Sequence, residues 1–216
     1  MIQVTNLSKK FQGRFALKNI NIKINREKVA VLGPNGAGKS TLAKLIAGVL
    51  RPTTGKIEVM GHDPYEAPFI RRRIGLVTHN PLLYKELTVK ENLEFFLRIY
   101  QIKKDHTKIV EELGISNVLN ERVSNLSRGY IQRVSIARAL ISDPEIIIMD
   151  EIMNSLDLEG KKIAMNLIRR FDGCLIFITH NLEESKFCDK FVVLEGGELK
   201  YYGNSFHEAF ETLNVP

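Results

Sequence analysis

The chain has 216 residues, a net charge of +6 and two cysteines, and 44% of its residues are hydrophobic. This length suits one large α/β domain, 1–216, with a small insertion, and it excludes two independent enzymes. The basic residues are mostly scattered, and the one tight cluster, 71–73, is typical of a solvated surface. We therefore expect no nucleic-acid partner.

The N-terminus lacks the apolar core of a signal peptide, and no apolar run approaches the roughly 20 residues of a membrane helix. Two cysteines, Cys174 and Cys188, are too few for a disulfide framework and indicate reduced thiols in a cytosolic protein. We therefore expect a soluble chain, and any membrane role would come through a partner.

The first predicted elements are strands of two kinds. Residues 2–7 and 20–24 form one kind, and the second segment alternates isoleucine with polar residues, which favours an antiparallel sheet with one solvated face. Residues 29–32 are uniformly apolar, as expected for a central parallel strand that is covered on both sides.

A glycine-rich segment follows this apolar strand and precedes a predicted helix over 42–50. It fits the pattern G-x-x-x-x-G-K-[ST] and consists of Gly33, Pro34, Asn35, Gly36, Ala37, Gly38, Lys39, Ser40 and Thr41. Its glycines can adopt backbone angles that turn successive N–H groups toward an anion, and the helix dipole points to the same place. Lys39 would reach the β- and γ-phosphates and Ser40 would ligate Mg²⁺, so the segment predicts an ATP site. The alternative is an ordinary strand–helix turn.

The middle of the chain is predicted to be helical after short strands over 56–60 and 74–77. Thr88 and Glu91 fit a capping box for a helix over 89–100, and a second helix over 105–113 is expected to stop at Gly114. We interpret 81–126 as a helical subdomain inserted between the two core parts, 1–80 and 127–216.

Strand–helix alternation then resumes, with Ser127 as the N-cap of a helix. Repeated units of this kind imply a mostly parallel sheet with helices on both faces. The expected helices cover 128–141, 158–171, 181–187 and a segment after Ser205, and the expected strands cover 145–149, 175–178, 191–194 and 199–202.

Three polar side chains follow predicted parallel strands, at the sheet edge where ligands bind. Asp150 ends an apolar strand and is the candidate Mg²⁺ ligand, directly or through water. Glu151 could orient and deprotonate the attacking water. His180 could sense the γ-phosphate and hold Glu151 or the water in line. The alternatives are a solvated Asp-Glu turn and a structural histidine.

Ser127 and Gly129 stand at the start of a predicted helix shortly before Asp150. A serine hydroxyl and a glycine N–H at a positive helix end predict a second anion site, for which one chain has no second phosphate. The alternative is a simple helix N-cap.

In their order and spacing, these segments resemble the nucleotide-binding subunit of an ABC transporter over essentially the whole chain. Residues 126–130 resemble the family signature Leu-Ser-Gly-Gly-Gln, 155–157 resemble the D-loop and 179–180 the H-loop. The resemblance implies an α/β P-loop NTPase (RecA-like) core with an N-terminal antiparallel β part and the helical subdomain. It also implies that Phe11 stacks on adenine and that Asp157 contacts the nucleotide.

The resemblance further implies two ATPs, each with Mg²⁺, between two subunits that pair head to tail as a homodimer, or as a heterodimer with another such ATPase. Closure of the dimer would drive separate transmembrane subunits from the cytoplasmic face of the membrane. Residues 79–96 resemble the short exporter ATPases, namely haem exporters of cytochrome c maturation and ABC-2-type drug exporters. The other classes considered are a non-transport ABC ATPase that acts on ribosomes or nucleic acid and a small-molecule kinase.

The chain departs from the family pattern at several positions. His79 stands where the family has a glutamine that touches Mg²⁺, and we hypothesise that His79 acts through a metal-bound water, with Asn80 as an alternative. Arg128 and Tyr130 replace a glycine and the glutamine of the signature, whereas Ser127 and Gly129 remain. Ile152 replaces a proline, and the D-loop begins with Ser155.

Overall fold

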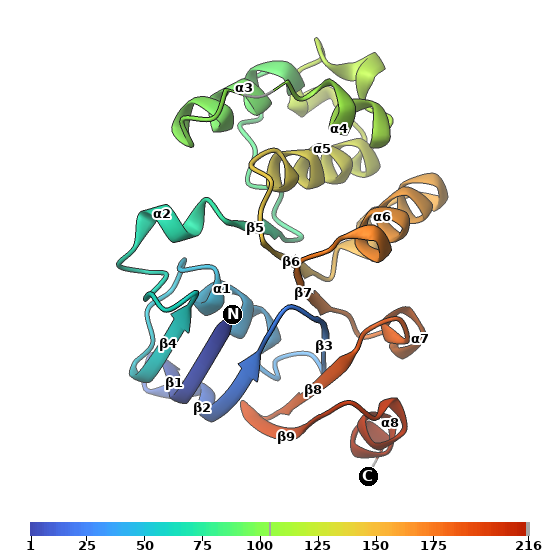
Figure 1. The fold of residues 1–216 in the computed structure, drawn as a ribbon. Coiled ribbons are helices and arrows are strands. Elements are labelled where there is room, and N and C mark those ends of the chain that lie inside the picture. Colours follow the sequence, from blue (N-terminus) through green and yellow to red (C-terminus); the bar gives the residue numbers. More distant parts are fainter. Residues whose placement is uncertain (104, 215–216) are drawn as a thin grey trace.

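The computed structural model describes residues 1–103 and 105–214. Its elements form two sheets with helices around them (Figure 1). The smaller sheet is antiparallel, in the order β2-β1-β4. It consists of β1 (Ile2–Phe11), β2 (Arg14–Ile24) and β4 (Thr54–Val59). The predicted antiparallel pairing is confirmed, and both N-terminal strands are longer than the predicted segments, 2–7 and 20–24.

The larger sheet has the order β5-β6-β7-β3-β8-β9, and only its edge strand β9 runs antiparallel to its neighbour. Its strands are β3 (Lys28–Leu32), β5 (Ile74–Val77), β6 (Ile146–Asp150), β7 (Cys174–Ile178), β8 (Lys190–Glu195) and β9 (Glu198–Gly203). This is the predicted α/β architecture. Strands β6, β7 and β3 lie side by side, so their carboxyl ends meet at one edge.

The two faces of the larger sheet belong to different hydrophobic cores. Successive residues of a strand point to opposite faces, so Ile148 and Ile176 pack with α1 and the antiparallel sheet, whereas Met149 and Phe177 pack with the other helices. The α-helices are α1 (Lys39–Ile46), α2 (Pro68–Arg71), α3 (Val89–Ile99), α4 (Thr107–Glu112), α5 (Arg128–Leu140), α6 (Leu158–Arg170), α7 (Leu182–Ser185) and α8 (Phe206–Asn214). Short 3₁₀ turns are η1 (Ser116–Val118), η2 (Val123–Asn125) and η3 (Ile152–Ser155).

Capping residues mark the points where several helices begin or end. Thr88 and Glu91 form the predicted capping box of α3, Ser127 caps α5, and Gly114 adopts φ +61° after α4. The predicted helix over 42–50 is wrong at its end, because Gly48 turns left-handed with φ +67° and the chain leaves α1 there.

The segment 81–126 carries α3 and α4, and both helices pack against α5. Figure 1 shows α5 with these helices above the sheet, although α5 also lies against β5. Helix α5 therefore contacts both the helices of 81–126 and strand β5 of the larger sheet. Within the described residues, none of the helices combines the length and the apolar composition that a membrane span requires.

Both cysteines are buried and unpaired, and burial raises the pKa of each thiol from 9.0 to about 12. We expect each thiolate fraction, and with it the rate of alkylation at pH 8, to be about a thousandfold lower in the folded protein than in guanidinium. Mass spectrometry after timed alkylation measures both rates. Rapid labelling of Cys174 or Cys188 without denaturant would contradict this.

Candidate active site

The loop between β3 and α1 has the backbone that the glycine pattern predicts. Gly33, Gly36 and Gly38 all adopt positive φ, at +141°, +80° and +101°. A Cβ on Gly33 would lie 2.0 Å from the Leu194 carbonyl oxygen, and one on Gly38 would lie 2.5 Å from that of Ala16. Both positions therefore require glycine, for conformation and for space.

This loop and the first turn of α1 line an open cleft of about 510 Å³. The other walls come from β2, from the loop after β5 and from the residue after β6. The lining residues are Ala16, Asn35, Gly36, Gly38, Lys39, Ser40, Thr41, His79 and Glu151. Ala16 was not predicted, because its place beside the loop depends on the packing of β2 against Gly38.

Lys39 begins α1 and its side chain is buried. Its Nζ donates to the carbonyl oxygens of Gly33 at 2.9 Å and Pro34 at 3.0 Å, and it lies 3.5 Å from Glu151 Oε1. The ammonium group is therefore held over the loop by neutral acceptors and one carboxylate, which a phosphate group can replace.

Asp150 ends β6 with 1% of its surface exposed. Neither carboxylate oxygen has a hydrogen-bond partner of normal geometry within the described chain. Burial raises the pKa of Asp150, and the nearby Ser40 hydroxyl partly opposes this. A buried, unsatisfied carboxylate beside a hydroxyl fits the oxygen ligands that Mg²⁺ takes.

Glu151 follows with φ +52°, a left-handed conformation that is uncommon for a non-glycine residue. Its N–H donates to the Ile178 carbonyl oxygen at 3.1 Å, which ties the end of β6 to the end of β7. This turn directs the Glu151 carboxylate to the cleft and to Lys39.

His79 lines the same cleft, on the loop that follows β5. Polar residues along α5 hold the surrounding loop: Gln132 donates to the Thr78 carbonyl, Ser135 to that of Pro81 and Arg138 to that of Leu76. Their spacing of three residues along one helix face is a sequence pattern that could have revealed this anchor.

His180 lies two residues beyond Ile178, the β7 partner of Asp150. His180 lines a neighbouring cavity of about 340 Å³, together with Gly33 and Pro34, and it does not line the cleft of the glycine loop. His180 therefore lies beside the loop on the predicted sheet edge. Phe11 sits exposed at the tip of the β1–β2 hairpin and does not line the cleft.

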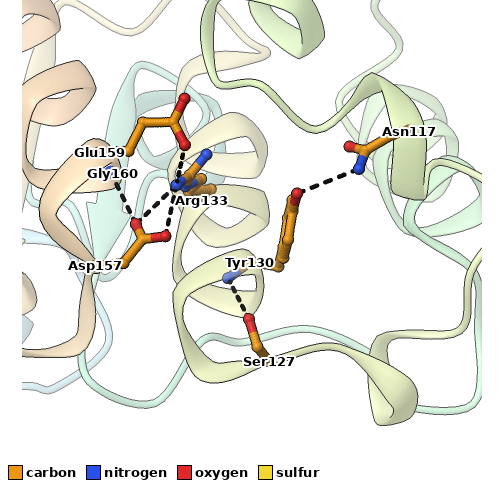
Figure 2. A network of polar contacts seen from close by, with 7 residues as sticks. All are labelled: Asn117, Ser127, Tyr130, Arg133, Asp157, Glu159 and Gly160. Atoms are coloured by element: carbon orange, nitrogen blue, oxygen red, sulfur yellow. Dashed lines mark hydrogen bonds and ion pairs between the residues drawn. The ribbon is translucent and has the colours of Figure 1, made fainter.

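Ser127 and Gly129 lie at the N-terminus of α5, and neither lines the cleft of the glycine loop. The Ser127 hydroxyl accepts from the Tyr130 N–H at 3.4 Å, as an N-cap (Figure 2). Asp157 caps α6 and pairs with Arg133. The structure therefore keeps the second predicted anion site apart from the first within one chain.

A parallel sheet, a glycine loop that leads into a helix, a buried lysine and a buried carboxylate define a P-loop nucleoside-triphosphate-binding protein. A family model described as ABC transporter matches residues 17–154. The chain belongs to this family, as an ATP-binding and ATP-hydrolysing subunit of a transporter.

Relatives with curated names cover both directions of transport. The chain is 36% identical to the ABC transporter ATP-binding protein NatA of Bacillus subtilis, over 94% of this chain and 89% of the relative. It is 37% identical to the molybdate/tungstate import ATP-binding protein WtpC of Methanocaldococcus jannaschii (94% and 71%). It is 34% identical to the Nod factor export ATP-binding protein I of Rhizobium etli (91% and 66%).

Solved structures give the same fold. A dimeric post-hydrolysis state of the ATP-binding cassette MJ0796 bound to ADP and Pi matches with a TM-score of 0.87 and 28% identity, over 94% of this chain and 98% of that chain. A second structure, described as the ATP binding subunit of an ABC transporter, matches with a TM-score of 0.88, over 100% and 95% of the two chains. These likenesses agree with the predicted P-loop core.

Proposed function

We propose that two copies of this chain close head to tail on two ATP molecules and so drive separate transmembrane subunits. One observation carries the proposal: the signature turn, Ser127 and Gly129, lies outside the cleft of its own chain. Its helix N-terminus offers a positive end and N–H groups to an anion that must come from a second copy. The dimeric state of MJ0796, a structural relative of this chain, supports the formation of a dimer.

Within each site, the loop 33–41 would cradle the phosphates and Lys39 would leave the Gly33 and Pro34 carbonyls for a phosphate oxygen. Ser40 and Asp150 would hold Mg²⁺, with His79 acting through a bound water. When bound, this ion neutralises charge on the phosphate oxygens. Glu151 would accept a proton from the attacking water, and His180 would hold the water or Glu151 in line. Phe11 would stack on the adenine.

Complementation between two inactive variants tests the arrangement. We expect Lys39→Ala and Ser127→Arg each to abolish ATPase activity, because every site of either homodimer is defective. In a mixed dimer, one site would combine both defects and the other would be intact. Random pairing then restores about a quarter of the wild-type activity in a 1:1 mixture. A mixture with no more activity than its components would contradict sites shared between subunits.

The second part of the proposal is the transmembrane partner. A groove of about 880 Å³ lies between α2, the loop after β5 and α3. Its walls are apolar and aromatic, with three arginines, Arg71, Arg72 and Arg138, and no carboxylate among its lining residues in the described chain. Such a groove suits an amphipathic partner helix with apolar anchors and an acidic residue.

With its groove bound to a transmembrane partner, the chain would sit on the cytoplasmic face of the membrane. We propose export as the direction, from the resemblance of 79–96 to exporter ATPases.

Phe69→Glu tests this groove. Phe69 lines the groove with 50% of its surface exposed, so a glutamate there removes an apolar anchor and adds a charge at little cost to folding. We expect co-purification with the membrane subunit to fall at least about tenfold, a loss of roughly 1.4 kcal/mol. ATP binding by the isolated chain should be unchanged. Phe210→Glu, at a position 44% exposed on α8 and outside the groove, is the control.

A further inference from the structure

An arginine joins the signature helix to the start of α6 (Figure 2). Arg133 Nη2 lies 2.7 Å from Asp157 Oδ1, 2.8 Å from Asp157 Oδ2 and 3.3 Å from Glu159 Oε2. The Arg133 side chain is 4% exposed, whereas both carboxylates reach the surface. A buried guanidinium that binds two carboxylates of another element holds that element in a defined position.

Two glycines make room for this arginine. A Cβ on Gly160 would lie 2.7 Å from Asp157 Oδ1 and 3.0 Å from Arg133 Nε, and a Cβ on Gly114 would lie 3.3 Å from the other end of the guanidinium. Gly160 also donates its N–H to Asp157 Oδ1 at 2.8 Å. An alanine at 160 would therefore displace the ion pair without removing a charge.

Tyr130 covers the opposite side of the arginine. Its ring centroid lies 5.4 Å from the Arg133 guanidinium carbon, within the range of a cation–π contact. Its hydroxyl accepts from Asn117 Nδ2 at 3.2 Å, which links the contact to η1 of the helical insertion (Figure 2). Tyr130 is one of the positions where this chain departs from the family signature, so the contact is a property of this sequence.

The ion pair also controls charge at the signature turn. A Cβ on Gly129 would lie 3.7 Å from Asp157 Oδ1, so this carboxylate is a close neighbour of the second anion site. The Arg133 guanidinium, followed by the Gly160 N–H, holds the pKa of Asp157 below its ordinary value, so Asp157 is ionised. Without Arg133, a free negative charge would face the phosphates that the turn has to bind.

We propose that Tyr130, Arg133, Asp157 and Gly160 form a clamp, which we call the α5–α6 clamp. It holds the signature turn and the segment 155–157 in a fixed position relative to each other. Its arginine also compensates the negative charge of Asp157. In this chain Asp157 is then a positioning residue rather than a direct contact of the nucleotide. This inference rests on the proposed head-to-tail dimer, because the clamp acts on the surface that the second copy meets.

The test uses the full chain with Glu151→Gln as parent, so that bound ATP is retained. Dimer formation is followed by light scattering against ATP concentration. We expect Arg133→Gln to raise the ATP concentration for half-maximal dimer formation by about tenfold or more. A change of this size lies within the interaction energies expected between residues of one ion-pair network. Adding Asp157→Asn should reverse most of this effect, because the uncompensated charge is removed. Arg133→Lys should be intermediate.

Binding of a fluorescent ATP analogue to the monomer separates positioning from nucleotide contact. It should stay within about twofold of the parent in each of these variants, because the clamp lies outside the cleft. The inference fails if Arg133→Gln dimerises like its parent, or if the double variant is as defective as Arg133→Gln. If the parent itself does not dimerise with saturating ATP, the proposed function fails first and the clamp with it.

Gly160→Ala provides a test that does not depend on a buried charge. Alanine favours the helix, so the variant should fold, while its methyl group displaces the pair. We expect Gly160→Ala, made in the wild-type enzyme, to have a kcat several-fold below that of the wild type and an unchanged affinity for ATP. Asn166→Ala, at an exposed position on the same helix, is the matched control and should behave as wild type. Equal kcat values for the two variants would also overturn the inference.

Discussion

Glu151→Gln is expected to lower kcat about 10²–10⁴-fold, the usual contribution of a general base, without weakening ATP binding. The amide keeps the size and the left-handed backbone of Glu151 but cannot accept the proton of the attacking water. It also removes the negative charge 3.5 Å from Lys39 Nζ, which leaves the ammonium free for a phosphate. Phosphate release under saturating ATP measures kcat, and equilibrium dialysis measures binding.

Glu58→Gln is the control for this change, because Glu58 is on β4 and does not line the cleft. Its kcat should equal that of the wild type. A Glu151→Gln enzyme that retains more than about a tenth of the wild-type kcat would show that another group accepts the proton. His79 lines the same cleft and would then be the first residue to replace.

Asp150→Asn is expected to reduce Mg²⁺-dependent ATPase activity at least about 10²–10³-fold, the range seen when one preorganised charge-stabilising group is lost. The same variant should be at least as stable as the wild type at pH 7 without Mg²⁺ and ATP. Burial raises the pKa of Asp150, so the folded protein carries an unfavourable charge that the amide removes. Each ~1 kcal/mol recovered would raise Tm by about 2–4 °C.

The contribution of Asp150 to folding stability changes with pH in a defined direction. Because the folded pKa of Asp150 is above its unfolded value, the folded state binds more protons between these two values. The contribution of Asp150 to stability therefore falls as the pH rises through that window, and Asp150→Asn should lose this slope. Thermal unfolding without Mg²⁺ from pH 3.5 to 8 measures it. Asp172→Asn, at an exposed position, is the control. Equal slopes for Asp150→Asn and wild type would contradict the prediction.

Local sequence patterns predicted what depends on neighbours in the chain. The positive φ values of the glycine loop and the caps at Thr88 and Ser127 follow from residues within a few positions of each other, so spacing alone indicated them. The uniformly apolar strands indicated which strands would be central. The order of these strands then placed Asp150 and His180 at one sheet edge, as the parallel connections imply.

By itself, the sequence determined the family, the ATP loop, the candidate metal ligand and the candidate base, because their chemistry needs particular residues at fixed spacing. Only the tertiary structure decided which side chains meet across the chain. It placed Ala16 beside Gly38, and it paired Arg133 with Asp157, 24 positions away. Such contacts form only when helices and strands pack, and no short-range pattern encodes the distance between them.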